Sequence, residues 1–248
     1  ERVPAPVPAR ARVFPAPDRH PPAAVIDVGK RPHVDLELSG FVRLVRQPAP
    51  IWRNVCVAFR VWCLGERLRA PFALQREQLG TAHAVLAARE CLGEHPGPVA
   101  ILSGDTPLLE AATLRAVIEA RAAAGAAIAF APSEPADPTG YGRVLRDGRG
   151  RPVRIVEERD ADGPTLALRE VNAGLYCADA AFLWRSLAEV GRGNAQREFY
   201  LTDLVALAAE GPGAVAVPVP AEEAAGVNDR ADLARAGRAL VRRMALDL

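Results

Sequence analysis

The chain has 248 residues, half of them apolar, so it can bury a substantial core and is not disordered as a whole. Its formal net charge of +1 gives no general reason to expect a nucleic-acid partner, and no apolar run approaches the ~20 residues of a membrane span. Four scattered cysteines and four histidines without metal-ligand spacing indicate reduced thiols, a cytoplasmic location and no structural zinc site.

Residues 1–73 differ in amino-acid composition from the rest of the chain. Residues 1–75 hold 11 of the 22 prolines and, with 12 basic and 6 acidic residues, a net charge of +6, whereas the remainder carries −5 (19 basic, 24 acidic). Frequent proline in residues 1–22 excludes a helix and favours a polyproline-like or disordered segment. Residues 55–64 are apolar, and periodicity leaves a buried strand or a short helix open. We therefore expect residues 1–73 to be irregular.

Beyond residue 74 the pattern alternates between strands and helices. Helices are predicted at 80–93 with Thr81 as N-cap, 106–125 with Gly125 as the stop signal, 180–190, 199–211 and 228–244. Strands are predicted at 98–105, 126–133, 166–179 and 214–220, and residues 141–158 read as two strands around a glycine-rich turn. This order predicts an α/β fold of the Rossmann-like type, with a mostly parallel sheet flanked by helices and a small antiparallel insertion.

Asp105 stands at the end of the apolar strand Val99–Leu102, after Ser103 and Gly104. In an open parallel sheet, ligands bind at the carboxyl ends of the strands, and a carboxylate there can hold a hard cation such as Mg²⁺. The alternative is an aspartate that caps the following helix, with Pro107 in its first turn. Asn228 has a similar alternative as the N-cap of the last helix. No G-x-G-x-x-G follows a strand, which disfavours a dinucleotide-dependent oxidoreductase.

Seven motifs occur in order between residues 74 and 243. They are LQREQLGTAHAV (74–85), SGDTPLL (103–109), DPTGYGRVLRD (137–147), IVEERDA (155–161), EVNAGLY (170–176), NAQREFYLTDLVALA (194–208) and GVNDRADLA (226–234). Together they resemble the uridyltransferase half of the bacterial bifunctional enzymes that make UDP-N-acetylglucosamine, in the sugar-nucleotidyltransferase family. The resemblance implies a UDP-N-acetylglucosamine diphosphorylase that converts UTP and N-acetylglucosamine 1-phosphate into UDP-N-acetylglucosamine, a cell-envelope precursor, and pyrophosphate.

The resemblance also implies roles for particular residues. Asp105 and Asn228 match the Mg²⁺ ligands of the family and are the residues expected to be essential for catalysis. The residues that match the uracil and nucleotide side are Gln75, Gly80, Thr81, Ser103 and Gly104, and those that match the sugar pocket are Gly140, Glu157 and Asn172. Spacing alone does not choose between Glu157 and Glu158, and the IVE pattern of the family favours Glu157.

Each of these residues also has a purely structural alternative. Gln75 could be a solvated loop residue and Thr81 a helix cap, while Gly140, Glu157 and Asn172 could belong to a turn, a hairpin surface and another turn. Tyr200, Thr202 and Asp203 read as partly architectural: Thr202 or Asp203 starts a helix, and the aromatic side chains pack beneath the site.

The family pattern breaks at both ends of the chain. The L-A-A-G-x-G-T-R-M loop, which grips the triphosphate in the family, has no counterpart in residues 1–73, and Lys30 does not follow a credible glycine loop. A segment of suitable length but wrong sequence suggests translation in a shifted reading frame; the alternatives are a diverged N-terminus and an unrelated fused segment. Residues 74–248 are expected to form an incomplete nucleotidyltransferase domain, without the β-helix acetyltransferase repeats that carry the trimer contacts in the family. Two alternatives follow, namely a catalytically impaired fragment and a sister enzyme acting on another sugar phosphate.

Overall fold

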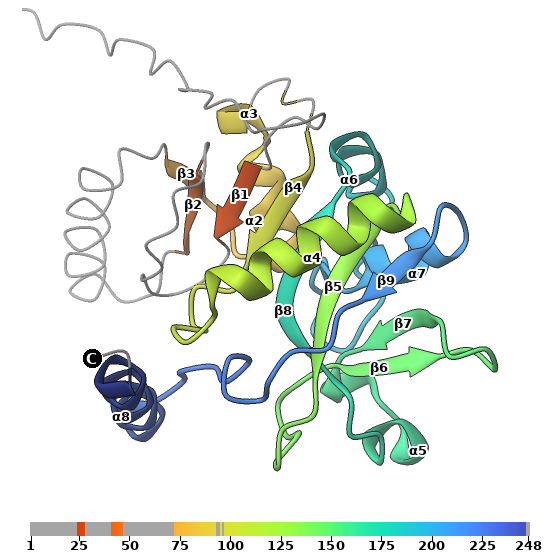
Figure 1. Ribbon diagram of the computed structural model, residues 1–248. Helices are drawn as coiled ribbons and strands as arrows, with labels where there is room; N and C mark the ends of the chain where they lie inside the picture. Colours follow the sequence, from red (N-terminus) through yellow and green to blue (C-terminus); the bar gives the residue numbers. More distant parts are fainter. Residues whose placement is uncertain (1–23, 28–40, 47–71, 93–94, 96, 247–248) are drawn as a thin grey trace, which may run out of the picture.

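The computed structural model describes residues 24–27, 41–46, 72–92, 95 and 97–246 (Figure 1). Its elements follow the chain as β1 (Ala24–Asp27), β2 (Phe41–Arg46), β3 (Phe72–Gln75), α2 (Thr81–Ala87), α3 (Arg89–Leu92), β4 (Val99–Leu102), α4 (Ala111–Ala124), β5 (Ile128–Ser133), β6 (Arg143–Arg146), β7 (Pro152–Val156), a 3₁₀ turn (Glu158–Asp160), α5 (Gly163–Leu166), β8 (Val171–Ala178), α6 (Ala180–Ser186), α7 (Asp203–Ala209), β9 (Ala214–Ala216) and α8 (Arg230–Leu246).

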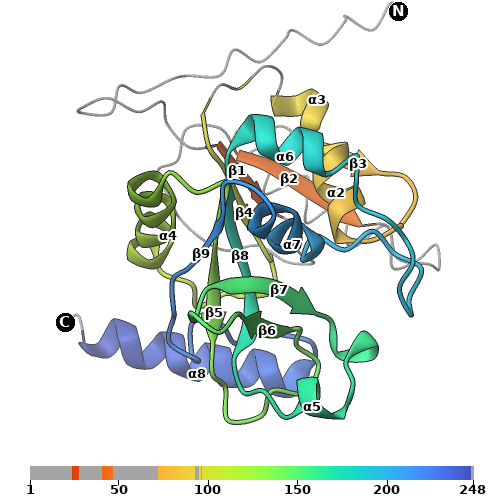
Figure 2. The same cartoon turned by 90° about the vertical axis from the view of Figure 1, so that its right-hand side faces the viewer.

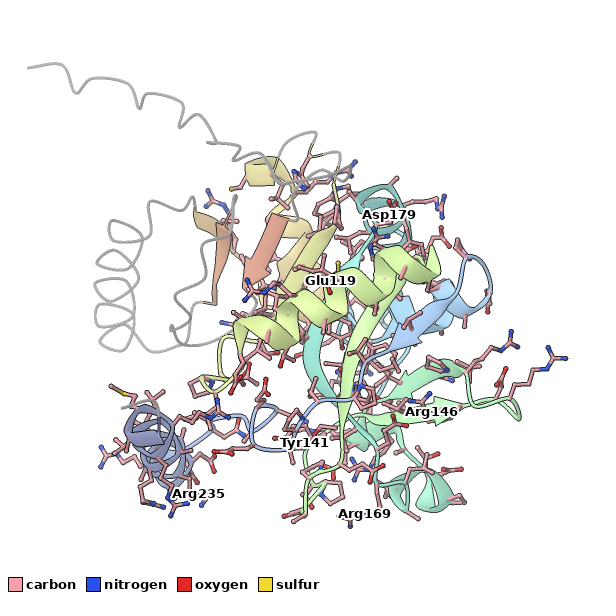
Figure 3. The ribbon with its side chains drawn as sticks, viewed as in Figure 1. Glu119, Tyr141, Arg146, Arg169, Asp179 and Arg235 are labelled. Atoms are coloured by element: carbon pink, nitrogen blue, oxygen red, sulfur yellow. The ribbon has the colours of Figure 1, made fainter. Side chains whose placement is uncertain are left out.

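One sheet organises the described residues, in the strand order β3-β2-β1-β4-β8-β5-β9. The pairs β1–β2, β1–β4, β2–β3 and β5–β9 are parallel, whereas β8 runs antiparallel to both β4 and β5, so the sheet is mixed. The β6–β7 hairpin is the predicted antiparallel insertion, and it pairs with β8 through β6. Arg146, which is labelled on the hairpin in Figure 3, donates to both carboxylate oxygens of Glu170 (2.8 and 2.6 Å). This pair ties the hairpin to the segment before β8.

Helices cover both faces of the sheet (Figure 2). Because strand side chains alternate, Val99 and Ile101 of β4 pack in the core that contains α2, α6 and α7, while Ala100 and Leu102 pack in the core that contains α4. All four residues of β4 are buried, as expected for a strand covered on both faces. The predicted α/β class is therefore confirmed.

The helix boundaries confirm some expectations and correct others. Gly125 adopts a left-handed conformation (φ 60°) and ends α4 as predicted. However, α4 begins at Ala111, so Pro107 lies in the preceding turn rather than in the first helical turn. The helix predicted at 80–93 is two short helices, and its N-cap is Gly80 rather than Thr81.

The expectation that residues 1–73 are irregular is wrong for β1 and β2. Both strands lie inside the sheet, where Ala24 pairs with Val99 and Val25 with Phe41. The sequences AVID and FVRLVR contain no proline and are rich in β-branched and apolar residues, so the high proline content around them does not prevent pairing. Residues 1–22 and 55–64, for which the sequence also gave expectations, lie outside the described residues. No helix in the described part of the chain is long and apolar enough to span a membrane.

Candidate functional site

Asp105 lies in the turn that follows β4. The turn is closed by Thr106, whose backbone N–H and hydroxyl both donate to the Ser103 carbonyl (3.3 and 2.7 Å). The next helix has Glu110 at its N-cap, so the alternative role of Asp105 as a helix cap is wrong. Glu223 satisfies that helix terminus instead, because its carboxylate accepts from the Glu110 N–H at 3.1 Å. Within the described residues, the Asp105 side chain is half-buried and makes no hydrogen bond.

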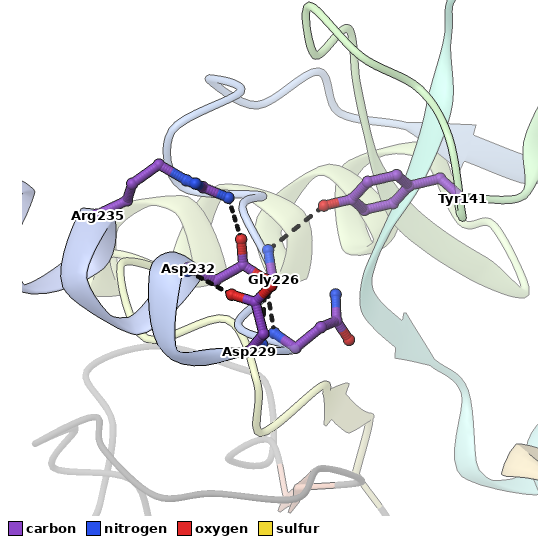
Figure 4. A network of polar contacts seen from close by, with 6 residues as sticks. Tyr141, Gly226, Asp229, Asp232 and Arg235 are labelled. Atoms are coloured by element: carbon purple, nitrogen blue, oxygen red, sulfur yellow. Dashed lines mark hydrogen bonds and ion pairs between the residues drawn. The ribbon is translucent and has the colours of Figure 1, made fainter.

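Asn228 immediately precedes the residue that caps α8. Asp229 accepts from the Asp232 N–H (2.8 Å), and the Asp232 carboxylate accepts in return from the Asp229 N–H (3.3 Å) (Figure 4). This reciprocal pair is a capping box, so the alternative role of Asn228 as N-cap is wrong. The Asn228 backbone N–H also donates to Asp232, while its exposed carboxamide makes no hydrogen bond within the part of the chain that the structure describes.

A backbone hydrogen bond brings the two loops together. The Val227 N–H donates to the Asp105 carbonyl at 2.8 Å, so Asn228 is one residue away from a direct contact with the turn after β4. The Gly226 N–H donates to the Tyr141 hydroxyl at 3.4 Å, which also joins the loop before the β6–β7 hairpin to this point (Figure 4).

The donor set at this point suits a hard divalent cation. Asp105 offers a carboxylate and Asn228 an amide oxygen, which are ligand types that Mg²⁺ accepts. Among the described residues, no group of three or more His, Cys, Asp or Glu side chains could hold a metal. A cation at this point would therefore depend on oxygen atoms from a substrate and from water, and this is how Mg²⁺ is often bound beside phosphates.

Gln75 ends β3 and is completely buried, with 0% of its surface exposed, so it is not a solvated loop residue. Its side-chain amide lies 3.2 Å from the Gly80 carbonyl and 3.0 Å from Nδ1 of His83. Gly80 has a φ of 118°, and a Cβ there would lie 2.4 Å from the Phe199 carbonyl oxygen. Only glycine allows this close approach of the two backbones.

Thr81 is tied to a distant part of the chain. Its hydroxyl accepts a hydrogen bond from the Leu201 N–H at 2.9 Å, and the neighbouring Ala82 N–H donates to the Phe199 carbonyl at 2.9 Å. The segment 199–202 is thus attached to the start of α2. As predicted, this segment leads into a helix, with Thr202 at the N-cap and Asp203 as the first residue of α7.

Ser103 and Asn172 both contact Gly174, near the start of β8. The Ser103 N–H donates to the Gly174 carbonyl (3.2 Å), and Gly104 lies in the turn between Ser103 and Asp105. A Cβ on Gly174 would lie 2.4 Å from the Ser103 hydroxyl oxygen. The Asn172 side chain accepts from the Gly174 N–H (3.1 Å) and donates to the Tyr176 hydroxyl (2.6 Å).

Glu157 and Glu158 point to different partners. The Thr202 hydroxyl donates to Oε1 of Glu157 at 3.0 Å. Burial raises the pKa of Glu157, the Thr202 hydrogen bond opposes that rise, and the nearby Asp160, Asp203 and Glu198 add to it. Glu158 instead accepts from the Gly140 N–H at 2.8 Å and lies 3.6 Å from the Arg143 guanidinium.

Glu157 also lies close to the pair formed by Asn172 and Tyr176. Burial is the main cause of the raised pKa of Tyr176, and the negative charge of Glu157 is the next. The segment 199–202 therefore links the two groups of predicted site residues, because Leu201 contacts Thr81 and Thr202 contacts Glu157. Within the described residues, no hydrogen bond joins Gln75 or Gly80 to Asp105.

Four residues at the site carry no assigned role in the sequence analysis or only an architectural one: His83, Tyr141, Thr202 and Glu223. The first three lie inside the quoted motifs, so their position beside predicted residues is the signal that could have found them. Glu223 has no such signal, because its partners on α4 are more than a hundred residues away in the sequence.

Comparisons with known proteins show which family the sequence matches. The sequence profile of the nucleotidyl transferase family matches residues 60–215. The chain is 67% identical over 177 residues to the bifunctional protein GlmU of Anaeromyxobacter sp. (strain Fw109-5), a match that covers 71% of this chain and 36% of that protein. It is 49% identical over 178 residues to the bifunctional protein GlmU of Pelobacter propionicus, covering 71% of this chain and 39% of that protein. The chain thus spans only 36–39% of the length of these relatives.

Proposed function

This chain belongs to the nucleotidyl transferase family, and on that premise we propose that it transfers the uridylyl group of UTP to N-acetylglucosamine 1-phosphate. The products are UDP-N-acetylglucosamine, a precursor of the cell envelope, and pyrophosphate, and the reaction takes place in the cytoplasm. The proposal is supported by the seven ordered motifs and by the identity to bifunctional GlmU proteins. It is favoured over a sister enzyme for another sugar because EVNAG and GVNDR both occur.

In this reaction a phosphate oxygen of the sugar attacks the α-phosphorus of UTP in line. The bond from the α-phosphorus to the bridging oxygen breaks, and pyrophosphate leaves with that oxygen. The chemistry requires no protein nucleophile; it requires the two phosphate groups to be aligned and their charge to be neutralised.

Asp105 and Asn228 are the residues that would hold Mg²⁺. When bound, Mg²⁺ neutralises phosphate charge that would otherwise repel the attacking oxygen. The observation that carries this proposal is the 2.8 Å hydrogen bond from Val227 to the Asp105 carbonyl, because it holds the two loops against each other. The proposal is also supported by the finding that neither the Asp105 nor the Asn228 side chain caps a helix.

The other predicted residues divide between the two substrates. Gln75, Gly80 and Thr81 bind the uracil side of the uridine nucleotide, and Ser103 and Gly104 lie beside the nucleotide. For the sugar, Glu157 accepts hydrogen bonds from hydroxyl groups, Asn172 binds the N-acetyl sugar, and Gly140 offers its backbone. Leu201 is hydrogen-bonded to Thr81 on the nucleotide side, and Thr202 is hydrogen-bonded to Glu157 on the sugar side. Because both groups are attached to one short segment, these bonds support the binding of both substrates at one site.

The test is release of pyrophosphate by the purified chain. We expect release only when UTP, Mg²⁺ and N-acetylglucosamine 1-phosphate are all present, with glucose 1-phosphate as a control substrate. A preference for glucose 1-phosphate would instead identify a sister enzyme. Binding of UDP-N-acetylglucosamine without turnover would identify an impaired fragment, as the missing counterpart of the phosphate-gripping loop in residues 1–73 suggests.

A further inference from the structure

Gln75 has a buried polar atom without a partner among the residues that the structure describes. Within them, its side-chain oxygen Oε1 accepts no hydrogen bond, although the side-chain nitrogen of the same residue has two partners. Buried acceptors are nearly always satisfied in folded proteins, so an unsatisfied one requires an explanation. A ligand that donates a hydrogen bond would supply the missing partner.

The orientation of the Gln75 carboxamide follows from its neighbours. The Gly80 carbonyl oxygen can only accept, so the atom 3.2 Å from it must be the side-chain nitrogen and not the oxygen. The same nitrogen lies 3.0 Å from Nδ1 of His83. Because that nitrogen has only hydrogens to offer, Nδ1 must accept, and the proton of the neutral imidazole is then on Nε2.

His83 is itself held in place by packing. It lies on α2 and is half-buried, with its ring stacked on that of Phe199 (6.3 Å between centroids, 25° between planes). The Phe199 N–H in turn donates to the Leu79 carbonyl at 2.7 Å, and the Phe199 carbonyl accepts from Ala82. The imidazole acceptor is thus anchored to the same backbone that passes over Gly80.

We propose that His83 is a positioning residue that makes the nucleotide site select uracil over cytosine. With both amide hydrogens of Gln75 bound to Gly80 and His83, the carboxamide group that lacks a partner among the described residues is the acceptor Oε1. An acceptor opposite ring position 3 pairs with the N3–H of uracil and repels the unprotonated N3 of cytosine. Without the His83 acceptor, one amide hydrogen of Gln75 loses its partner and only the 3.2 Å hydrogen bond to the Gly80 carbonyl holds this orientation, so rotation of the carboxamide to donate to cytosine costs one hydrogen bond instead of two. This inference rests on the proposed function, because it takes Gln75 as a contact of the base.

The test compares UTP and CTP binding by calorimetry in the full chain and two variants. His83→Phe keeps an aromatic ring beside Phe199 but removes the acceptor, whereas His83→Asn keeps an acceptor near the position of Nδ1. We expect the wild-type chain and His83→Asn to prefer UTP by at least about tenfold, and His83→Phe to lose most of that preference. A role in packing alone predicts the opposite order, because Phe replaces the ring better than Asn.

The outcomes separate this inference from the proposed function. An unchanged UTP preference in folded His83→Phe, or a lost preference in His83→Asn, overturns the inference alone. Absence of pyrophosphate release together with a His83-dependent UTP preference overturns the function and leaves the inference standing. Failure of the wild-type chain to prefer UTP overturns the inference. If His83→Phe does not fold, the nitrogen chemical shifts of His83 in the wild-type chain decide: a proton on Nε2 supports the proposal, and a proton on Nδ1 overturns it.

Discussion

Asp105 and Asn228 are polar side chains next to helix termini, where such residues ordinarily act as caps. In this chain other residues take over that role, since Asp229 and Asp232 cap α8 and Glu223 accepts from the N-cap residue of α4 and from Thr113 in its first turn. A carboxylate and a carboxamide that are not needed for capping can bind a ligand. Because other residues cap α4 and α8, the side chains of Asp105 and Asn228 are available for the proposed Mg²⁺ site.

Asp105→Asn tests the charge at this site. The substitution keeps the backbone carbonyl that accepts from Val227, so we expect the fold to persist. Loss of the negative charge should reduce Mg²⁺-dependent pyrophosphate release by roughly 100-fold or more. The control is Glu119→Gln, an exposed carboxylate on α4 that should leave turnover unchanged. Full activity of Asp105→Asn at saturating Mg²⁺ would exclude Asp105 as a metal ligand.

Glu157→Gln tests the cost of burying a carboxylate. Because burial raises its pKa, Glu157 binds a proton more tightly in the folded chain than in the unfolded chain. Its contribution to stability is therefore fullest below the unfolded pKa and is lost as the pH rises through the raised pKa. We expect Glu157→Gln to raise the melting temperature at pH 8 relative to the wild-type chain, with a smaller difference at pH 4. Equal differences at the two pH values would contradict this prediction.

The same substitution should weaken sugar binding. A neutral amide oxygen still accepts from Thr202 but is a weaker acceptor for sugar hydroxyls than a carboxylate. We expect the KM for N-acetylglucosamine 1-phosphate to rise about tenfold, with little change in the KM for UTP. Equal increases in both KM values would indicate a general disturbance of the site rather than a sugar contact.

At the scale of elements, the connection from β9 to α8 is attached to the sheet at several points. The Val217 and Val219 N–H groups donate to carbonyls of β5, and Glu223 accepts from the Glu110 N–H and the Thr113 hydroxyl at the start of α4. Arg243 of α8 donates to the Leu108 carbonyl at 2.7 Å. These contacts hold Val227 against Asp105 and so set the position of Asn228.

Glu223→Ala should loosen this connection. The variant leaves the Glu110 N–H and the Thr113 hydroxyl without their acceptor, which should lower the free energy of unfolding by about 1–2 kcal/mol. We also expect faster hydrogen exchange at the Val227 amide, because its partner Asp105 is less firmly held. Glu223→Gln retains an acceptor oxygen and is the matched control. Unchanged exchange at Val227 in Glu223→Ala would show that Glu223 does not position this loop.

Gly80→Ala should disrupt the junction of β3, α2 and the segment 199–202. The new Cβ would meet the Phe199 carbonyl at 2.4 Å, and the φ of 118° is itself strained for alanine. We expect a loss of at least about 2 kcal/mol in denaturant unfolding. The matched control is Gly148→Ala in the hairpin turn, where a Cβ has open space and should change stability little. Equal stability of the two variants would contradict the close packing at Gly80.

For the molecule as a whole, features that depend on neighbouring residues could be predicted from the sequence. The four apolar residues of β4 and Gly125 at the end of α4 are examples, because burial on both faces and a left-handed cap have local signatures. The β6–β7 hairpin around its glycine-rich turn is another.

Features that depend on distant partners could not be predicted in this way. Thr81 resembles a cap in sequence, but it accepts from Leu201, which is 120 residues away. The antiparallel direction of β8 follows from the path of the chain around the hairpin, and the helix-terminus contact of Glu223 spans 113 residues. The strands β1 and β2 were obscured by the proline-rich segments around them, although their own residues favour pairing.

The central claim is that Asp105 and Asn228 bind one divalent cation together. The most direct test is a crystal structure of the chain with UDP-N-acetylglucosamine and Mg²⁺. We predict that a carboxylate oxygen of Asp105 and the amide oxygen of Asn228 both lie about 2.1 Å from the same ion, with phosphate oxygens and water completing an octahedron. A bound nucleotide sugar whose ion contacts neither side chain, or only one of them, would contradict the account.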